Sequence, residues 1–162
     1  MTSEGRLLNS IRDLVGRLEL PPGQFFTPNE SFWLHLRLQP ATKYIECGAG
    51  NGYTTVKALQ RGIDMSAVDI AYREDMDNVV LMLDATLDML PWSPRCWPLI
   101  CRPSHGGWAG QVMSNAIRRG ASTLYVGLER NVEVDIPDAF RTTLVAPDVG
   151  LEGESMYVVS KE

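Results

Sequence analysis

Three alternate glycines follow an acidic residue in the stretch Ile45-Glu46-Cys47-Gly48-Ala49-Gly50-Asn51-Gly52. The apolar residues ahead of it are typical of a buried strand, and residues 53–61 after it have the pattern of a helix. Glycines at such a turn let the backbone adopt positive φ angles and let a ligand approach main-chain N–H groups. The stretch therefore predicts a nucleotide-like cofactor site, with a sheet built around it.

The composition is that of an ordinary globular domain. The chain has 162 residues, 44% apolar and 22% charged, which is long enough to bury roughly 70% of its unfolded surface. We expect one domain over residues 1–162, with residues 1–40 as a helical cover and residues 41–162 as a cofactor-binding α/β core. The net charge of −5 does not support a nucleic-acid partner.

Cysteine usage and hydropathy indicate a cytoplasmic protein. Three cysteines do not form an even disulfide framework, and charged residues interrupt the N-terminal apolar positions, which excludes a signal-peptide core. No apolar run approaches the roughly 20 residues that span a bilayer. We therefore expect no contact with a membrane.

Strand and helix patterns alternate along the chain. Strands are expected at 44–47, 65–70, 79–83, 99–101 and 123–128, and helices at 7–18, 31–38, 53–61 and 108–119. Two further strands, 141–146 and 156–160, are joined by a glycine-containing loop that predicts an antiparallel hairpin. The predicted fold is α/β: a three-layer sandwich with a mostly parallel seven-stranded sheet and an antiparallel C-terminal hairpin.

Acidic residues follow two of the predicted strands. In parallel sheets ligands bind at the carboxyl ends of the strands, so Gly48, Asp69, Asp84 and Cys101 should face one crevice. Asp69 lies 21 positions after Gly48, which fits an acid that accepts hydrogen bonds from a ribose diol. Asp84 and Ala85 are placed to meet an adenine, through the carboxylate and a backbone N–H respectively.

The glycine spacing argues against a dinucleotide. The dinucleotide fingerprint is G-x-G-x-x-G, but Gly52 comes one position early and Tyr53 takes the expected place. Glu46 would also repel a pyrophosphate, whereas it could organise the loop or hold a ligand's ammonium group through water. These features favour S-adenosylmethionine and disfavour a nicotinamide-dependent oxidoreductase. The alternative is a glycine turn that only packs a helix against a strand, with solvated acids at the strand ends.

These motifs resemble the first three cofactor motifs of the class I S-adenosylmethionine-dependent methyltransferases, and the final hairpin is similar to theirs. The resemblance covers residues 41–160 and implies a Rossmann-like methyltransferase fold. It implies that the glycines contact the methionine and ribose portion, Asp69 the ribose hydroxyls and Asp84 the adenine. The residues expected to bind the cofactor are Glu46, Gly48, Ala49, Gly50, Gly52, Asp69, Ile70, Asp84, Ala85, Cys101 and Arg102.

The chain departs from this family at the reactive end. Residues 101–105 read Cys-Arg-Pro-Ser-His, where enzymes that methylate nucleic-acid amino groups carry an acid or Asn, then Pro-Pro and an aromatic residue. Methylation of adenine or cytosine amino groups therefore loses support. His105 is a candidate catalytic base, because imidazole titrates near neutral pH. A loop histidine that only forms a hydrogen bond is the alternative.

The cysteines and the tryptophans lead to two further expectations. The spacing Cys96-x4-Cys101-x3-His105 matches no common zinc module, so no metal site is expected. Trp97 is expected in the core, while Trp92 and Trp108 are left open between the core and stacking on a planar ligand.

The sequence thus predicts an S-adenosylmethionine-dependent methyltransferase that acts on an unidentified acceptor. The alternative is a degenerate module that binds the cofactor and acts through partners without methyl transfer. Short helical elements after the second and third strands favour that alternative. The acceptor and the oligomeric state do not follow from the sequence.

Overall fold

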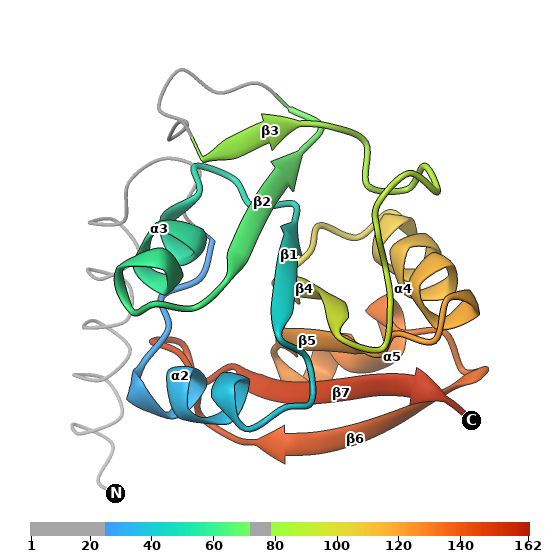
Figure 1. Ribbon diagram of the computed structural model, residues 1–162. Coiled ribbons are helices and arrows are strands. Elements are labelled where there is room, and N and C mark those ends of the chain that lie inside the picture. Colours follow the sequence, from blue (N-terminus) through green and yellow to red (C-terminus); the bar gives the residue numbers. More distant parts are fainter. Residues whose placement is uncertain (1–24, 72–78) are drawn as a thin grey trace, which may run out of the picture.

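One seven-stranded sheet runs through the protein in the computed structural model, which describes residues 25–71 and 79–162 (Figure 1). The strand order is β3-β2-β1-β4-β5-β7-β6. The strands are β1 (Lys43–Cys47), β2 (Met65–Asp69), β3 (Val80–Met82), β4 (Cys96–Cys101), β5 (Thr123–Gly127), β6 (Phe140–Ala146) and β7 (Ser155–Lys161). Strands β1 to β5 pair in parallel, while β7 is antiparallel to both β5 and β6. The predicted mostly parallel sheet with its antiparallel hairpin is confirmed.

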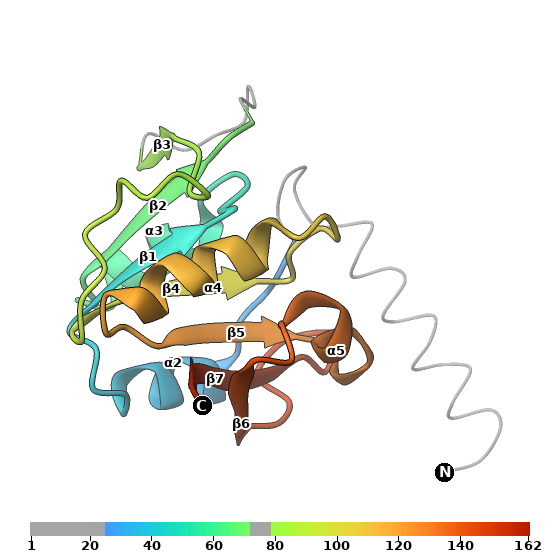
Figure 2. The ribbon, with the colours of Figure 1, turned by 90° about the vertical axis from the view of Figure 1, so that its right-hand side faces the viewer.

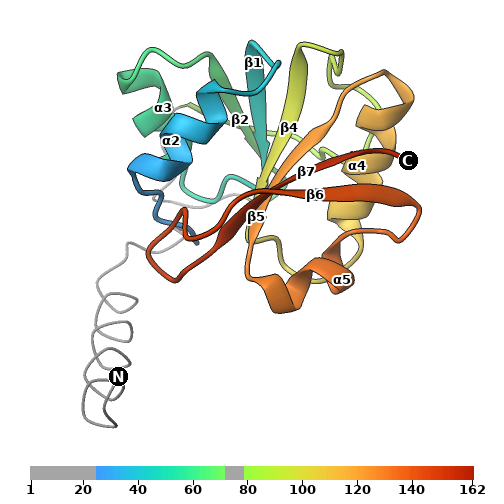
Figure 3. The ribbon, with the colours of Figure 1, turned by 90° about the horizontal axis from the view of Figure 1, so that it is seen from below.

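Helices cover both faces of the sheet, as a three-layer sandwich requires. They are α2 (Glu30–Arg37), α3 (Tyr53–Gln60), α4 (Trp108–Arg118) and α5 (Val132–Asp135), with a 3₁₀ turn, η1 (Glu129–Asn131), before α5. Seen from below, α2 and α3 lie on one face and α4 and α5 on the other (Figure 3). The helix expected at 7–18 and most of the connection at 71–78 lie outside the described residues. The assignment of residues 1–162 to one domain stays a prediction.

Helix α2 begins where the sequence predicts a cap. The Asn29 side chain accepts a hydrogen bond from the Phe32 N–H at 3.2 Å, and satisfies a helix N-terminal donor. The same side chain donates to the Asp148 carbonyl at 2.8 Å, and the Asn29 N–H donates to the Val149 carbonyl at 2.9 Å. The start of α2 is therefore tied to the loop between β6 and β7.

Strand β4 is longer than predicted. It begins at Cys96 rather than at Leu99, and it includes Pro98. Pairing with β1 starts at Cys96, but pairing with β5 starts only at Leu99. Pro98 therefore sits where the strand has a neighbour on one side only, a position that tolerates a missing N–H. Trp97 and Trp92 are both buried in the core.

Helix α4 runs along the sheet beside β4, and α5 lies near the end of β5 (Figure 2). The buried face of α4 includes Ala109, Val112, Met113 and Ala116, while Ile117 is only half-buried. None of the helices in the described part of the chain is long and apolar enough to cross a membrane.

Candidate cofactor site

The glycine loop is fixed to the neighbouring strand by backbone hydrogen bonds. The Gly48 and Ala49 N–H groups both donate to the Val68 carbonyl of β2, at 3.0 and 3.1 Å. All three glycines adopt the left-handed conformation that favours this residue: Gly48 at φ +70°, Gly50 at +62° and Gly52 at +89°. The alternate glycines therefore meet a conformational need that L side chains fill only with strain.

Asp69 joins the glycine loop to the end of β2. Its Oδ2 accepts the Gly50 N–H at 2.8 Å, and its Oδ1 accepts the Ala71 N–H at 2.9 Å. The side chain is buried, with 8% of the residue exposed. Each carboxylate oxygen has more than one acceptor position, so both retain capacity for a ligand hydroxyl. The two N–H groups fix the orientation of this carboxylate.

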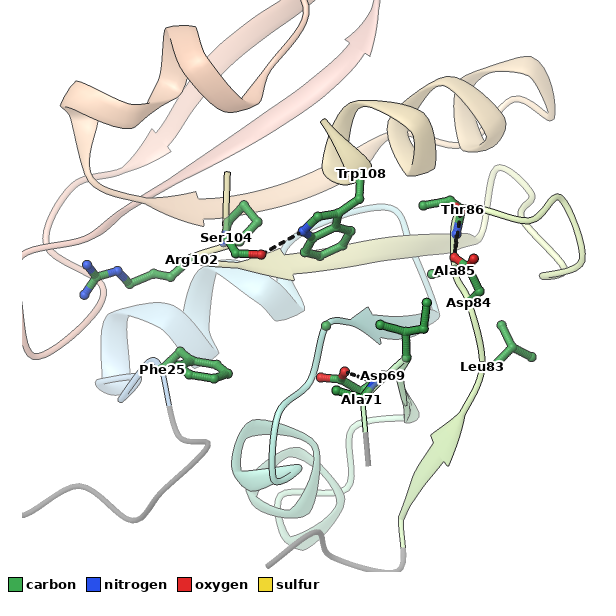
Figure 4. A pocket seen from close by; sticks show the side chains of 13 residues that line it. Phe25, Asp69, Ala71, Leu83, Asp84, Ala85, Thr86, Arg102, Ser104 and Trp108 are labelled. Atoms are coloured by element: carbon green, nitrogen blue, oxygen red, sulfur yellow. Dashed lines mark hydrogen bonds between the residues drawn. The ribbon is translucent and has the colours of Figure 1, made fainter. Parts of the chain in front are cut away.

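A cavity of about 630 Å³ opens at the carboxyl ends of β1 to β4 (Figure 4). It is lined by Phe25, Gly48, Asp69, Ile70, Ala71, Leu83, Asp84, Ala85, Thr86, Arg102, Pro103, Ser104 and Trp108. Six residues of the predicted site are in this set: Gly48, Asp69, Ile70, Asp84, Ala85 and Arg102. The predicted crevice at the strand ends therefore exists.

The other predicted residues lie beside or behind this cavity. Glu46, Ala49 and Cys101 line a smaller recess, which shares Gly48 and Phe25 with the cavity. Gly50 and Gly52 line neither hollow. These two glycines shape the loop rather than form its cavity surface.

Asp84 closes a tight turn after β3. Its Oδ1 accepts the Thr86 hydroxyl at 2.6 Å and the Thr86 N–H at 2.9 Å. These two hydrogen bonds, the hydroxyl one first, lower the pKa of the Asp84 carboxyl. The group therefore presents a charged acceptor to the cavity at neutral pH.

Glu46 is buried between β1 and α3. Only 3% of the residue is exposed, and its Oε1 accepts the Thr55 hydroxyl at 3.0 Å. Burial raises the pKa of the Glu46 carboxyl to about 7, although the Thr55 hydrogen bond opposes this shift. Glu46 thus links the strand before the glycine loop to the helix after it.

Arg102 reaches the cavity wall through a left-handed backbone, with φ +49°. Its guanidinium forms an ion pair with Glu152 and lies 3.5 Å from the Glu154 carboxylate. Figure 4 shows the side chain directed away from Asp84 and Trp108. Two acids therefore neutralise this cation, and the other charged residues that line the cavity in the described part of the chain are Asp69 and Asp84.

Trp108 covers the first glycine of the loop. A Cβ atom on Gly48 would lie 2.7 Å from the indole Cη2, closer than real contacts allow. The indole N–H donates to the Ser104 hydroxyl at 3.2 Å (Figure 4). Gly48 is therefore required both by its φ and by the close approach of an aromatic ring, and Trp108 belongs to the site.

Comparison with solved structures finds the same architecture in three proteins, two of which are described as methyltransferases. The 23S rRNA methyltransferase ErmE aligns with a TM-score of 0.55 and 12% identity, covering 86% of this chain and 70% of that one. A precorrin-6Y C5,15-methyltransferase from Geobacter metallireducens aligns with a TM-score of 0.52 and 10% identity, covering 85% and 94%. MtNAS, in complex with MTA and tNA, aligns with a TM-score of 0.53 and 18% identity. The alignment covers 82% of this chain, which spans only 58% of the length of MtNAS.

The chain has the class I S-adenosylmethionine-dependent methyltransferase fold. No known family signature and no curated protein matches its sequence. At these identities the likeness concerns the fold alone.

Within this methyltransferase fold, six lining residues escaped sequence reasoning: Phe25, Ala71, Leu83, Thr86, Pro103 and Ser104. Phe25 precedes α2 and carries no motif, so no local signal places it beside the glycine loop. Thr86 could have been predicted from the sequence, since a hydroxyl two residues after an aspartate is a common turn pattern.

His105 does not line the cavity, although its neighbour Ser104 does. Its Nδ1 lies 2.8 Å from the Asp135 carboxylate. All three cysteines are free and buried. Across residues 25–71 and 79–162, no group of three His, Cys, Asp or Glu side chains is arranged to hold a metal ion.

Proposed function

We propose that the chain binds S-adenosylmethionine in the cavity of about 630 Å³ and transfers its methyl group to an acceptor. One observation carries the proposal: the Asp69 carboxylate is held by the Gly50 and Ala71 N–H groups beside Gly48. An acid fixed next to a glycine loop provides acceptors for a ribose diol and an open backbone for the group attached to it.

In this proposal, different lining residues bind different portions of the cofactor. Gly48 and Ala49, which line the cavity or the adjoining recess, bind the methionine portion, and Asp69 binds the ribose hydroxyls. Ile70, Asp84 and Ala85 take the adenine. Glu46 and Cys101 border the adjoining recess, which we assign to the ammonium end of the methionine portion.

Charge supports a cationic ligand. Asp69 and Asp84 line the cavity, while the guanidinium of Arg102 is paired with Glu152. S-adenosylmethionine carries a sulfonium and an ammonium group, and carboxylates nearby favour both over a neutral or anionic ligand. A pyrophosphate would meet repulsion at the same place.

When bound, the cofactor supplies an activated methyl group. The protein's contribution is alignment, because in-line geometry of reacting atoms lowers the barrier without a special chemical group. Arg102, Pro103, Ser104 and Trp108 form the wall that follows β4. We assign the acceptor to this side.

A second candidate, a module that binds the cofactor without methyl transfer, has one observation in its favour. Residues 83–95, which the structure describes in full, form turns without a helix. The wall next to the predicted adenine position is therefore thin. Turnover of labelled methyl groups separates this candidate from the first.

Calorimetry with S-adenosylmethionine, S-adenosylhomocysteine and NAD tests the proposal. We expect binding of the two adenosyl ligands but not of NAD. Asp69→Ala should weaken that binding at least tenfold, since a hydrogen bond to a charged acceptor contributes about 1.5–3 kcal/mol. Asp64→Ala is the matched control, because Asp64 lies just before the same strand with an exposed side chain. No heat with either adenosyl ligand would refute the proposal.

A further inference from the structure

Three polar side chains from three segments form one chain of hydrogen bonds. Nδ1 of His105 lies 2.8 Å from Oδ1 of Asp135, and the Tyr125 hydroxyl donates to the other oxygen, Oδ2. His105 belongs to the loop after β4, Asp135 to α5 and Tyr125 to β5. No motif in the sequence connects these positions.

The direction of these hydrogen bonds fixes the tautomer of the neutral histidine. Burial, together with the hydrogen bond to Asp135, raises the pKa of the Tyr125 hydroxyl, so this group stays a donor. Asp135 then accepts at both oxygens, and the neutral His105 ring carries its proton on Nδ1. Its Nε2 is an acceptor, and it has no hydrogen-bond partner within the described residues.

Burial differs sharply along this chain of groups. The Asp135 side chain is 4% exposed and Tyr125 is fully buried, whereas the His105 side chain is 54% exposed. Tyr157 of β7 and Arg102 lie near enough to Tyr125 to influence it electrostatically. A rigid, buried acid thus orients an accessible imidazole, which is the arrangement of a positioned general base.

We propose that Nε2 of His105 accepts the proton that the methyl acceptor loses, with Asp135 and Tyr125 as positioning residues. The proposal rests on the proposed function and places the acceptor at the rim of the cavity, because His105 follows the lining residue Ser104 without lining the cavity itself. It names the acceptor class: a group that must lose a proton on methylation, such as a hydroxyl, a thiol or an ammonium group. A thioether or a tertiary amine has no such need.

The step balances as follows. The acceptor's heteroatom forms a bond to the methyl carbon, and the carbon–sulfur bond breaks with its electron pair going to sulfur. The acceptor's proton moves to Nε2 of His105, giving an imidazolium that the Asp135 carboxylate stabilises. Because the ring is half-exposed, the proton then passes to solvent.

The first test is independent of activity. Long-range ¹H–¹⁵N NMR reads the tautomer of each imidazole, and the chain contains only two histidines. We expect His105 to be protonated on Nδ1 and not on Nε2. Its signals are identified because they are lost in His105→Gln. In Asp135→Asn we expect a smaller fraction of the ring to be protonated on Nδ1. A wild-type ring protonated on Nε2 would overturn the proposal.

The second test follows transfer of the tritiated methyl group of S-adenosylmethionine to catechol, thiophenol and benzylamine. We expect turnover of at least one, and none of dimethyl sulfide or N,N-dimethylaniline. His105→Gln should lower kcat about 100-fold or more, since a positioned base contributes roughly that factor. Asp135→Asn should lower kcat comparably, and Tyr125→Phe by roughly tenfold. His35→Gln, on α2, is the matched control and should keep full activity.

The pH dependence of kcat should differ between the wild type and His105→Gln, because the variant has no group at position 105 that can accept a proton. Cofactor affinity should stay within about threefold in all three variants, which also shows that they fold. Failure of the wild type to bind the cofactor would contradict the proposed function instead. Binding without transfer to any proton-losing acceptor, or transfer unaffected by His105→Gln, would overturn this inference alone.

Discussion

At the scale of single residues, Glu46 makes stability depend on pH. Its carboxyl has a pKa of about 7 in the folded protein against 4.5 for an ordinary glutamate, chiefly because it is buried. A raised carboxyl pKa means that the folded state favours the protonated form. The contribution of Glu46 to stability is therefore fully present below pH 4.5, and it is lost as pH rises through 7.

Glu46→Gln should remove this loss. The amide stays neutral and can still accept the Thr55 hydroxyl, so the variant should gain stability over the wild type by roughly 2 kcal/mol between pH 5 and pH 8. Urea denaturation at both pH values measures the difference. A gap between variant and wild type that does not change with pH would contradict this reading of Glu46.

Gly48→Ala tests the close approach of Trp108. The new Cβ adds a clash with the indole to the strain of a positive φ, so we expect a loss of about 2 kcal/mol or more and a changed tryptophan emission. Gly62→Ala is the control, because Gly62 has φ +74° and nothing within 4 Å of an added Cβ. That variant should lose about 1 kcal/mol and keep its emission. Equal losses would rule out the clash.

Site residues could be predicted where a residue with a suitable side chain directly follows a predicted strand. Gly48, Asp69 and Asp84 follow strands, and their spacing to one another is visible in the sequence. Asp135 was not predictable, because its 30-residue separation from His105 has meaning only after the sheet has folded. The turn of Arg102 toward Glu152 depends in the same way on a loop 50 residues away.

At the scale of elements, the cap of α2 joins two parts of the fold. Asn29→Ala removes both the helix cap and the hydrogen bond to the Asp148 carbonyl, so we expect a loss of about 1–2 kcal/mol in thermal or urea unfolding. Asn29→Asp keeps the cap acceptor but not the amide donor, and it should lose less. An unchanged unfolding midpoint in Asn29→Ala would show that the cap contributes nothing.

The ends of elements with a strong hydrophobic periodicity were predicted nearly to the residue. The ends of elements that contain proline were not. Helix α3 and strand β2 end within one residue of expectation. Strand β4 was predicted too short, at 99–101, because the sequence does not reveal that β5 begins pairing only at Leu99. Tertiary context decides whether Pro98 is tolerated.

At the scale of the whole molecule, the alternation of strands and helices indicated the three-layer sandwich. The glycine loop indicated that the cavity lies at the carboxyl ends of the strands. The glycine-containing loop between the last two strands indicated the antiparallel hairpin. The shape of the wall after β4 could not be predicted, since Trp108 and Ser104 meet only across a loop. The cofactor end of the site is therefore more visible in the sequence than the acceptor end.

The placement of β7 between β5 and β6 makes β6 dependent on β7. Among the described residues strand β6 pairs with β7 alone, although it precedes β7 in the chain. It is therefore attached to the sheet only through the pairing of β7 with β5. Any opening of that pairing releases β6 as well, and leaves unpaired strand edges that are open to pairing with another chain.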